Sequence, residues 1–350
     1  VAAVSADELD ATGCPQVIDA SGKWVMPGFL DIHTHYDVEL WKDAGLAESV
    51  RHGVTTVTMG SCSISTVHVD AEDAGDLFGR VEAIPRDHVV TAMSGNKTWS
   101  NAEEYIAALE KLPLGPNISA FMGHSDLRVS TMGLDRATDD HVRPTRAELD
   151  VMEAKLTAAL EAGFAGMSIM NLKFDKLDGE RCRSRTIPST YAKPREFRRL
   201  KSVIRSRGAV VQSAPNIRMP IDIVSHAVQS WGLFRKPLKT TLAAAMDSKS
   251  NPLGWTVLKA VMRLGNLFGG NFRFQHLPVP FTVYADGIDF VMFEEFGSGE
   301  EAMHLADCVE HDELNAALRA DLQVSVPGTC RLIGSTRSWK RSRRTRNGTC

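Results

Sequence analysis

The sequence predicts an α/β fold whose strands pair in parallel, as a (β/α)8 barrel or a doubly wound sheet. β-branched or apolar runs typical of strands, such as 55–60 and 164–170, alternate with helix-like segments of about ten or more residues. Crossovers of this length favour parallel pairing, because the chain must return to the same end of the sheet before each new strand. At least six such units fit, and no internal repeat is visible.

Composition places the chain among ordinary globular enzymes. It has 350 residues, of which 43% are apolar and 24% charged. The formal net charge of -3 gives no reason to expect nucleic acid as a partner. No apolar run approaches the roughly 18 residues that would span a membrane. The six cysteines lack paired spacing, which predicts reduced thiols in a cytoplasmic protein.

The individual elements follow from periodicity and end signals. An apolar run with a Pro-Gly break covers 24–35, and strands are predicted at 55–60, 88–93, 118–123, 164–170, 209–213 and 238–246. Helices are predicted at 46–52, 71–83, 101–112, 145–162, 196–206, 221–229 and 257–264. Ser100 is placed to cap the third helix. Thr145 and Glu148 form a capping box for the fourth, which Gly163 ends.

Two histidines at the end of the first apolar run are the sharpest chemical feature. In Pro27-Gly28-Phe29-Leu30-Asp31-Ile32-His33-Thr34-His35-Tyr36-Asp37, the two imidazoles are two residues apart and project to the same side of an extended strand. Active sites of such barrels lie at the carboxyl ends of the strands. Two neutral imidazoles on one face suit Zn²⁺, whereas a pair of surface histidines is the alternative.

A cysteine follows the next predicted strand. In Thr58-Met59-Gly60-Ser61-Cys62-Ser63-Ile64-Ser65, the thiol of Cys62 reaches the same rim as the two histidines. A thiolate is a strong zinc ligand and can bridge two ions. A small buried hydrophobic cysteine is the alternative, which the His-x-His after the preceding strand disfavours.

The segment 25–65 resembles N-acyl-D-amino-acid deacylases (D-aminoacylases), a branch of the amidohydrolase superfamily. That branch has a His-x-His after strand one and a cysteine in a Gly-Asn-Cys-Gly-like turn after strand two, which here reads Gly60-Ser61-Cys62-Ser63. Gly123-His124-Ser125-Asp126-Leu127-Arg128 and the segment 159–168 resemble two further family segments. The similarity covers about residues 15–215. It implies a TIM-like (β/α)8 amidohydrolase barrel, of which about six units are present over 25–322. Residues 1–24 would be the remnant of a flanking β-sandwich.

The chain also departs from the family pattern. Where the branch has a metal-binding His after strand five, this sequence reads Gln212-Ser213-Ala214-Pro215-Asn216. The His expected after strand six is also absent, and His226 falls within a predicted helix, where it is interpreted as structural. No counterpart of the catalytic aspartate after strand eight is evident, and Asp286 and Asp289 fit only if the strands are miscounted. The basic stretch 323–350 is interpreted as disordered or out of frame, with nucleic-acid binding as the alternative.

The resemblance implies hydrolysis of the amide of a small N-acyl-D-amino acid, releasing a D-amino acid and a carboxylate. One or two zinc ions would be held by His33, His35 and Cys62, with Asp37 as a supporting residue. The catalytic residue stays unassigned. His124 and Arg128 are candidates for binding the substrate carboxylate, with a structural hydrogen-bonded pair as the alternative. Two other interpretations remain open: an inactive remnant of such an enzyme, and an amidohydrolase acting on cyclic amides.

Overall fold

A computed structural model describes residues 5, 10–82, 84–172, 175–183, 185–215, 220–232, 235–245 and 254–276. Within these residues seven parallel strands form one sheet in sequential order, from β1 to β7. The strands are β1 (Phe29–Asp31), β2 (Val54–Met59), β3 (Asn117–Gly123), β4 (Gly166–Met170), β5 (Val210–Ala214), β6 (Lys239–Ala245) and β7 (Asn271–His276). The strand order rises without reversal, as in a barrel, whereas a doubly wound sheet reverses its order at a switch point.

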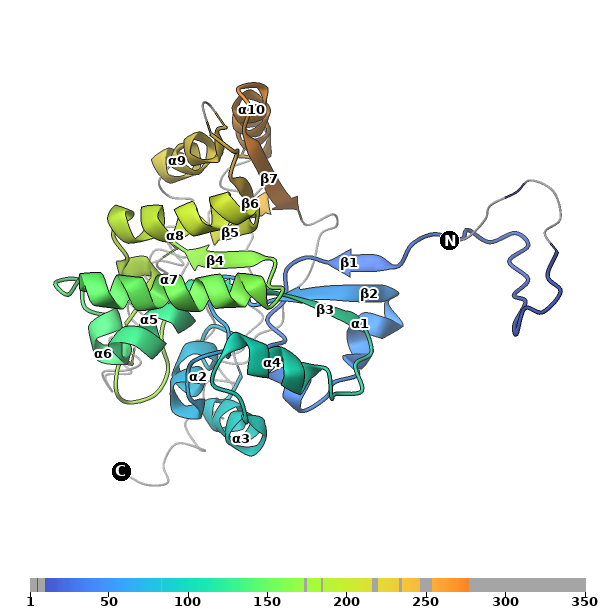
Figure 1. Cartoon of the computed structure of the whole chain (residues 1–350), viewed down its shortest axis with the longest axis horizontal. Coiled ribbons are helices and arrows are strands. Elements are labelled where there is room, and N and C mark those ends of the chain that lie inside the picture. The colour runs from blue at the N-terminus through green and yellow to red at the C-terminus, as the bar shows by residue number, and fades with distance from the viewer. Residues whose placement is uncertain are drawn as a thin grey trace, which may run out of the picture.

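Helices connect the strands (Figure 1). Along the chain they are η1 (Glu39–Trp41), α1 (Ala47–Arg51), α2 (Ala71–Phe78), α3 (Arg86–Asn96), α4 (Ala102–Leu109), α5 (His124–Met132), α6 (Leu134–Ala137), α7 (Arg146–Glu161), η2 (Pro188–Tyr191), α8 (Pro194–Arg207), α9 (Pro220–Ser230) and α10 (Gly254–Leu267). Neighbouring crossover helices contact one another, as α4 with α7, α7 with α8 and α9 with α10. The arrangement is an incomplete TIM-like α/β barrel of parallel strands, so the predicted fold class is confirmed.

The sheet curves until its first and last strands approach each other. The Nδ1 atom of His33, two residues after β1, lies 2.6 Å from Oε1 of Gln275 in β7. These residues are 242 positions apart in the sequence. The carboxyl ends of the seven strands therefore surround one polar region.

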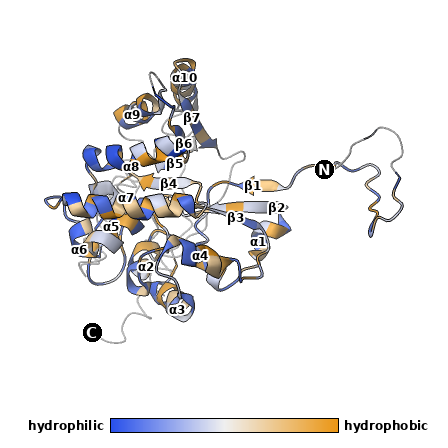
Figure 2. Cartoon of the chain, viewed as in Figure 1, coloured by the Kyte–Doolittle hydropathy of each residue, from blue (hydrophilic) through white to orange (hydrophobic). Residues whose placement is uncertain are grey.

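Most of the apolar core packs between the sheet and its helices from β2 to β5. A second, smaller cluster joins α9, β6 and β7 through Ile223, Ala227, Leu242 and Phe272. β1 differs, because Phe29 and Leu30 are exposed, and Figure 2 shows it as a hydrophobic strand at the edge of the sheet. Residues 10–24 extend away from the body without helix or strand (Figure 1).

Three local predictions were wrong. Segment 88–93 is part of helix α3, because Val89 and Met93, four residues apart, are buried on one helical face. Helix α4 is capped by Asn101, whose side chain accepts the Glu104 amide, whereas Ser100 donates to the Glu104 carboxylate. The seventh strand was not predicted, although apolar Phe272 and Phe274 alternate with polar Asn271, Arg273 and Gln275. The capping box of α7 is present as predicted.

Candidate metal centre

The three predicted ligands come together at the carboxyl ends of β1 and β2. One ligand atom from each of His33, His35 and Cys62 lies within 4.8 Å of the other two. Nε2 of His33 is 3.2 Å from the Cys62 sulfur, and the two imidazole centroids are 5.3 Å apart. Among the described residues no other such group of His, Cys, Asp and Glu was found.

These donors fit a zinc ion. Bond lengths of about 2.3 Å to sulfur and 2.0 Å to nitrogen place two ligands of a tetrahedral ion roughly 3.5 Å apart. The observed 3.2 Å between the His33 nitrogen and the Cys62 sulfur is close to that value. Nδ1 of His35 is buried and makes no hydrogen bond among the described residues, and a carboxylate oxygen of Glu82 lies 3.5 Å from it.

Burial sets the protonation of the cluster. It lowers the pKa of His35 to about 4 and also lowers the pKa of His33, so both imidazoles are neutral at pH 7. Burial raises the pKa of the Cys62 thiol well above its ordinary value, and the carboxylates of Asp175 and Glu82 add to this effect. Cys62 can therefore act as a third ligand of a cation only with loss of its proton.

A strained turn presents Cys62. Gly60, Cys62 and Ser63 have φ angles of 72°, 50° and 73°, in the left-handed region. Only glycine is possible at position 60, because a Cβ there would lie 2.1 Å from the Phe121 carbonyl oxygen. Left-handed backbone at residues other than glycine is costly and collects at functional sites. The surrounding hydrogen bonds must therefore hold this turn in place.

Side chains from later strands supply those hydrogen bonds. Oε1 of Gln212 in β5 accepts the Cys62 amide at 3.0 Å, and Oγ of Ser168 in β4 accepts the Ser63 amide at 3.0 Å. The hydroxyls of Ser63 and Ser125 lie 2.8 Å apart. Gln212 thus lies in the stretch 212–216, where the family pattern has an imidazole, and its side chain holds the cysteine turn.

The predicted supporting residue also acts on this turn. The carboxylate of Asp37 is 1% exposed and accepts the Gly60 amide at 3.0 Å. Burial raises its pKa to about 7, against the lowering effect of that amide. Asp37 thus holds the turn before Cys62. Among the described residues its carboxylate forms no hydrogen bond or ion pair with an imidazole.

Two acidic residues that the sequence analysis missed lie beside the cluster. Oε1 of Glu82, in the turn after α2, is 3.5 Å from Nδ1 of His35. Asp175, after β4, is 5% exposed and lies near enough to Cys62 to raise the thiol pKa. Burial raises the pKa of both carboxyls to about 7. The only sequence signal was their position in loops that follow β2 and β4.

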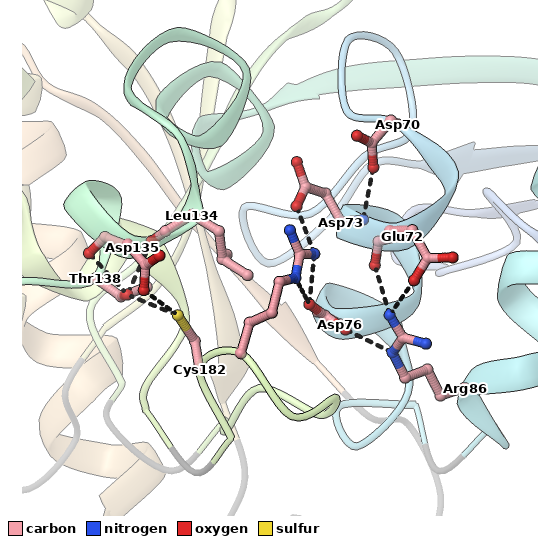
Figure 3. A network of polar contacts seen from close by, with 10 residues as sticks. Asp70, Glu72, Asp73, Asp76, Arg86, Leu134, Asp135, Thr138 and Cys182 are labelled. Carbon is pink, nitrogen blue, oxygen red and sulfur yellow. Dashed lines mark hydrogen bonds and ion pairs between the residues drawn. The ribbon is translucent and has the colours of Figure 1, made fainter.

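An ion-pair network ties the loop after β4 to α2. Asp76, fully buried, accepts hydrogen bonds from Nε of Arg86 at 2.6 Å and from the guanidinium of Arg181 at 2.6 Å. Arg181 also pairs with Asp73 at 2.8 Å. Figure 3 shows Asp73 and Asp76 of α2 facing this loop, with Arg86 on the other side of Asp76. The network fixes the loop of Asp175 relative to the helix that precedes Glu82.

His124 and Arg128 lie elsewhere, in a closed buried cluster. Both are fully buried, and both contact Glu196 of α8. Nε2 of His124 is 2.9 Å from Oε1 of Glu196, and Arg128 donates to both carboxylate oxygens at 2.7 and 2.5 Å. Arg128 also donates to the Ala137 carbonyl oxygen at 3.1 Å. These contacts favour the structural alternative over binding of a substrate carboxylate.

The remaining predictions fall on other parts of the chain. His226 is 2% exposed, and its Nδ1 donates to the Asp222 carbonyl oxygen at 2.8 Å, in agreement with a structural role. Asp286, Asp289 and the basic stretch 323–350 lie outside the described residues. Among the helices that are described, none has the length and apolar character needed to cross a membrane.

Comparison with known sequences identifies a family for part of the chain. Residues 16–186 match the amidohydrolase family. Over 319 residues the chain is 55% identical to an uncharacterised protein of Mycobacterium tuberculosis, an alignment that covers 90% of this chain and 52% of that protein. It is 29% identical over 221 residues to an N-acyl-D-glutamate deacylase of Alcaligenes xylosoxydans xylosoxydans, covering 63% and 39% respectively. The chain therefore spans about half, or less, of the length of these relatives.

Solved structures give the same fold. An N-acyl-D-glutamate deacylase from Bordetella bronchiseptica, crystallised with zinc and a phosphonate inhibitor, matches with a TM-score of 0.58 and 24% identity. That match covers 75% of this chain and 49% of the deacylase. A D-aminoacylase matches with a TM-score of 0.56 and 20% identity, covering 72% and 48%. Residues 16–186 of this chain therefore belong to an amidohydrolase family domain.

Proposed function

We propose that this chain is the metal-binding part of a hydrolase that cleaves the amide bond of N-acyl-D-amino acids, with His33, His35 and Cys62 as zinc ligands. The observation that carries the proposal is the convergence of these three donors at the carboxyl ends of two adjacent barrel strands. The similarity to an N-acyl-D-glutamate deacylase and to an N-acyl-D-aspartate deacylase supports this substrate class.

The residues of the site have two roles, as ligands of the ion and as supports of the cysteine turn. The neutral imidazoles of His33 and His35 and the Cys62 sulfur bind the ion, while Gln212, Ser168 and Asp37 hold the cysteine turn. A zinc ion held by these residues would supply Lewis acidity for polarising an amide carbonyl and for lowering the pKa of a water molecule. The Cys62 thiolate could bind a single ion or bridge two ions.

Metal content tests the first step. Elemental analysis of the purified chain should find about one zinc per chain, and a His33→Ala/His35→Ala double variant should lose it. The matched control is His52→Ala/His88→Ala, which removes two exposed imidazoles away from the cluster and should keep the metal. Absence of zinc from the parent chain, or equal loss in the control, would refute the proposed ligands.

Substrate turnover tests the second step. The metal-loaded chain should release amino acid from N-acetyl-D-glutamate, N-acetyl-D-aspartate or N-acetyl-D-leucine, and not from the L enantiomers. Turnover of hydantoins or dihydropyrimidines instead would favour the cyclic-amide alternative. A chain that binds zinc but cleaves none of these compounds would be an inactive remnant.

A further inference from the structure

Gln275 connects the last described strand to the metal cluster. It lies in β7, is 6% exposed, and its amide makes two contacts across to the segment after β1. Oε1 is 2.6 Å from Nδ1 of His33, and Nε2 is 3.5 Å from the Ile32 carbonyl oxygen. No other side chain among the described residues contacts Nδ1 of His33 at hydrogen-bond distance.

These two contacts fix which way the amide faces. The Ile32 carbonyl oxygen can only accept a hydrogen bond, so the NH2 group of Gln275 must face it. The amide oxygen then faces the imidazole and can only accept from it. A flipped amide would set two oxygens against each other at Ile32. The proton of neutral His33 is therefore on Nδ1.

That tautomer leaves a lone pair on Nε2 of His33, which can accept from the Cys62 thiol or bind an ion. Nε2 is the atom that lies 3.2 Å from the Cys62 sulfur, on the side of the ring where the three ligand atoms converge. The opposite tautomer would place a proton at Nε2 and remove one donor from the cluster. The position of a single proton thus decides whether the site has three ligands or two.

We propose that Gln275 is a positioning residue of the metal centre, which holds His33 in the Nδ1-protonated tautomer and directs Nε2 toward Cys62. The part that concerns zinc rests on the proposed ligands, whereas the tautomer of His33 does not. Groups that orient a metal-binding imidazole commonly change metal affinity about 10- to 100-fold when they are removed.

Nitrogen NMR of the metal-free chain tests the tautomer directly. With ¹⁵N-labelled histidine, the His33 signals are identified by their loss in His33→Ala. In the parent chain the Nδ1 signal of His33 should be of the protonated type and the Nε2 signal of the unprotonated type. In Gln275→Leu the two forms should mix. A protonated Nε2 in the parent chain would overturn the proposal, and this measurement needs no variant of Gln275 to fold.

Zinc affinity, measured by competition with a chromogenic chelator, tests the consequence. Gln275→Leu should weaken binding about 10- to 100-fold, whereas Gln275→Glu, which keeps an acceptor oxygen, should restore most of it. The control is Thr240→Val, which removes a buried hydroxyl of β6 that, within the described part of the chain, donates to the Leu238 carbonyl oxygen alone. Equal loss in the Leu, Glu and Val variants, or no loss in the Leu variant, would overturn the positioning role.

The two measurements separate this inference from the proposed function. If the parent chain binds no zinc, the proposed metal centre fails, while the tautomer of His33 is still measured in the metal-free protein. If the parent chain binds zinc and Gln275→Leu binds it equally well, the centre stands and the role of Gln275 fails.

Discussion

Nε2 of His33 and the sulfur of Cys62 are 3.2 Å apart, although 29 positions separate these residues in the sequence. The distance results from two neighbouring parallel strands that end at the same level, with Asp31 of β1 in register with Val57 of β2. A helical crossover lies between them in the chain. The contact is therefore a product of strand register, and residues that alter the turn after β2 should alter the site.

The left-handed conformation of Ser63 makes a stability prediction. Ser63→Gly and Ser63→Ala both remove the hydroxyl that contacts Ser125, but only alanine keeps a Cβ at a φ of 73°. We expect the glycine variant to be more stable than the alanine variant by about 1–2 kcal/mol in urea unfolding. Ser206, in helix α8, is the control. There the order should reverse, with alanine more stable by about 0.5–1 kcal/mol.

The buried pair of Arg128 and Glu196 should act on stability and not on substrate binding. Arg128→Met leaves the Glu196 carboxylate buried and only partly paired, so we expect a loss of about 3–5 kcal/mol in free energy of unfolding. The added substitution Glu196→Gln should recover part of that loss. A stable Arg128→Met chain with a raised KM would instead support the carboxylate-binding role predicted from the sequence.

The network of Figure 3 should stabilise the loop after β4. Arg86→Met removes one of the two guanidinium groups that donate hydrogen bonds to Asp76, which is fully buried. We expect a loss of about 1.5–3 kcal/mol, together with faster hydrogen exchange of the backbone in 175–183. Arg51→Met removes an exposed pair with Glu48 and should change stability by less than about 1 kcal/mol.

His226 should make stability depend on pH. Burial, aided by nearby Lys201, lowers its pKa to about 4, whereas an unfolded histidine titrates near 6.5. Between these values the unfolded chain takes up a proton that the folded chain refuses. The contribution of His226 to stability should therefore be complete above about pH 6.5 and should fall toward pH 4, by roughly 3 kcal/mol. His226→Gln should reduce the dependence of unfolding free energy on pH in this range by that amount, whereas exposed His141→Gln should leave it unchanged.

Local patterns in the sequence were sufficient for the fold class and for the three proposed ligands. Alternating strands and helices predicted parallel pairing, and the position of His33, His35 and Cys62 directly after strands placed them on one rim. Periodicity identifies the strands and helices, and in a parallel barrel the order of strands in the sheet follows their order along the chain. They failed at 88–93, where β-branched residues occur in a helix whose buried face is set by packing.

The supporting contacts were decided only by the tertiary structure. Gln275 reaches His33 across 242 positions, and Gln212 reaches Cys62 across 150, because the sheet curves and brings the inner faces of distant strands together. Neither glutamine has a local pattern that marks its partner. The same holds for Arg128. The sequence left open whether it binds substrate or has a structural partner, and the structure pairs it with Glu196 of α8. The sequence thus determined which residues are at the rim, and the curvature of the sheet determined which of them touch.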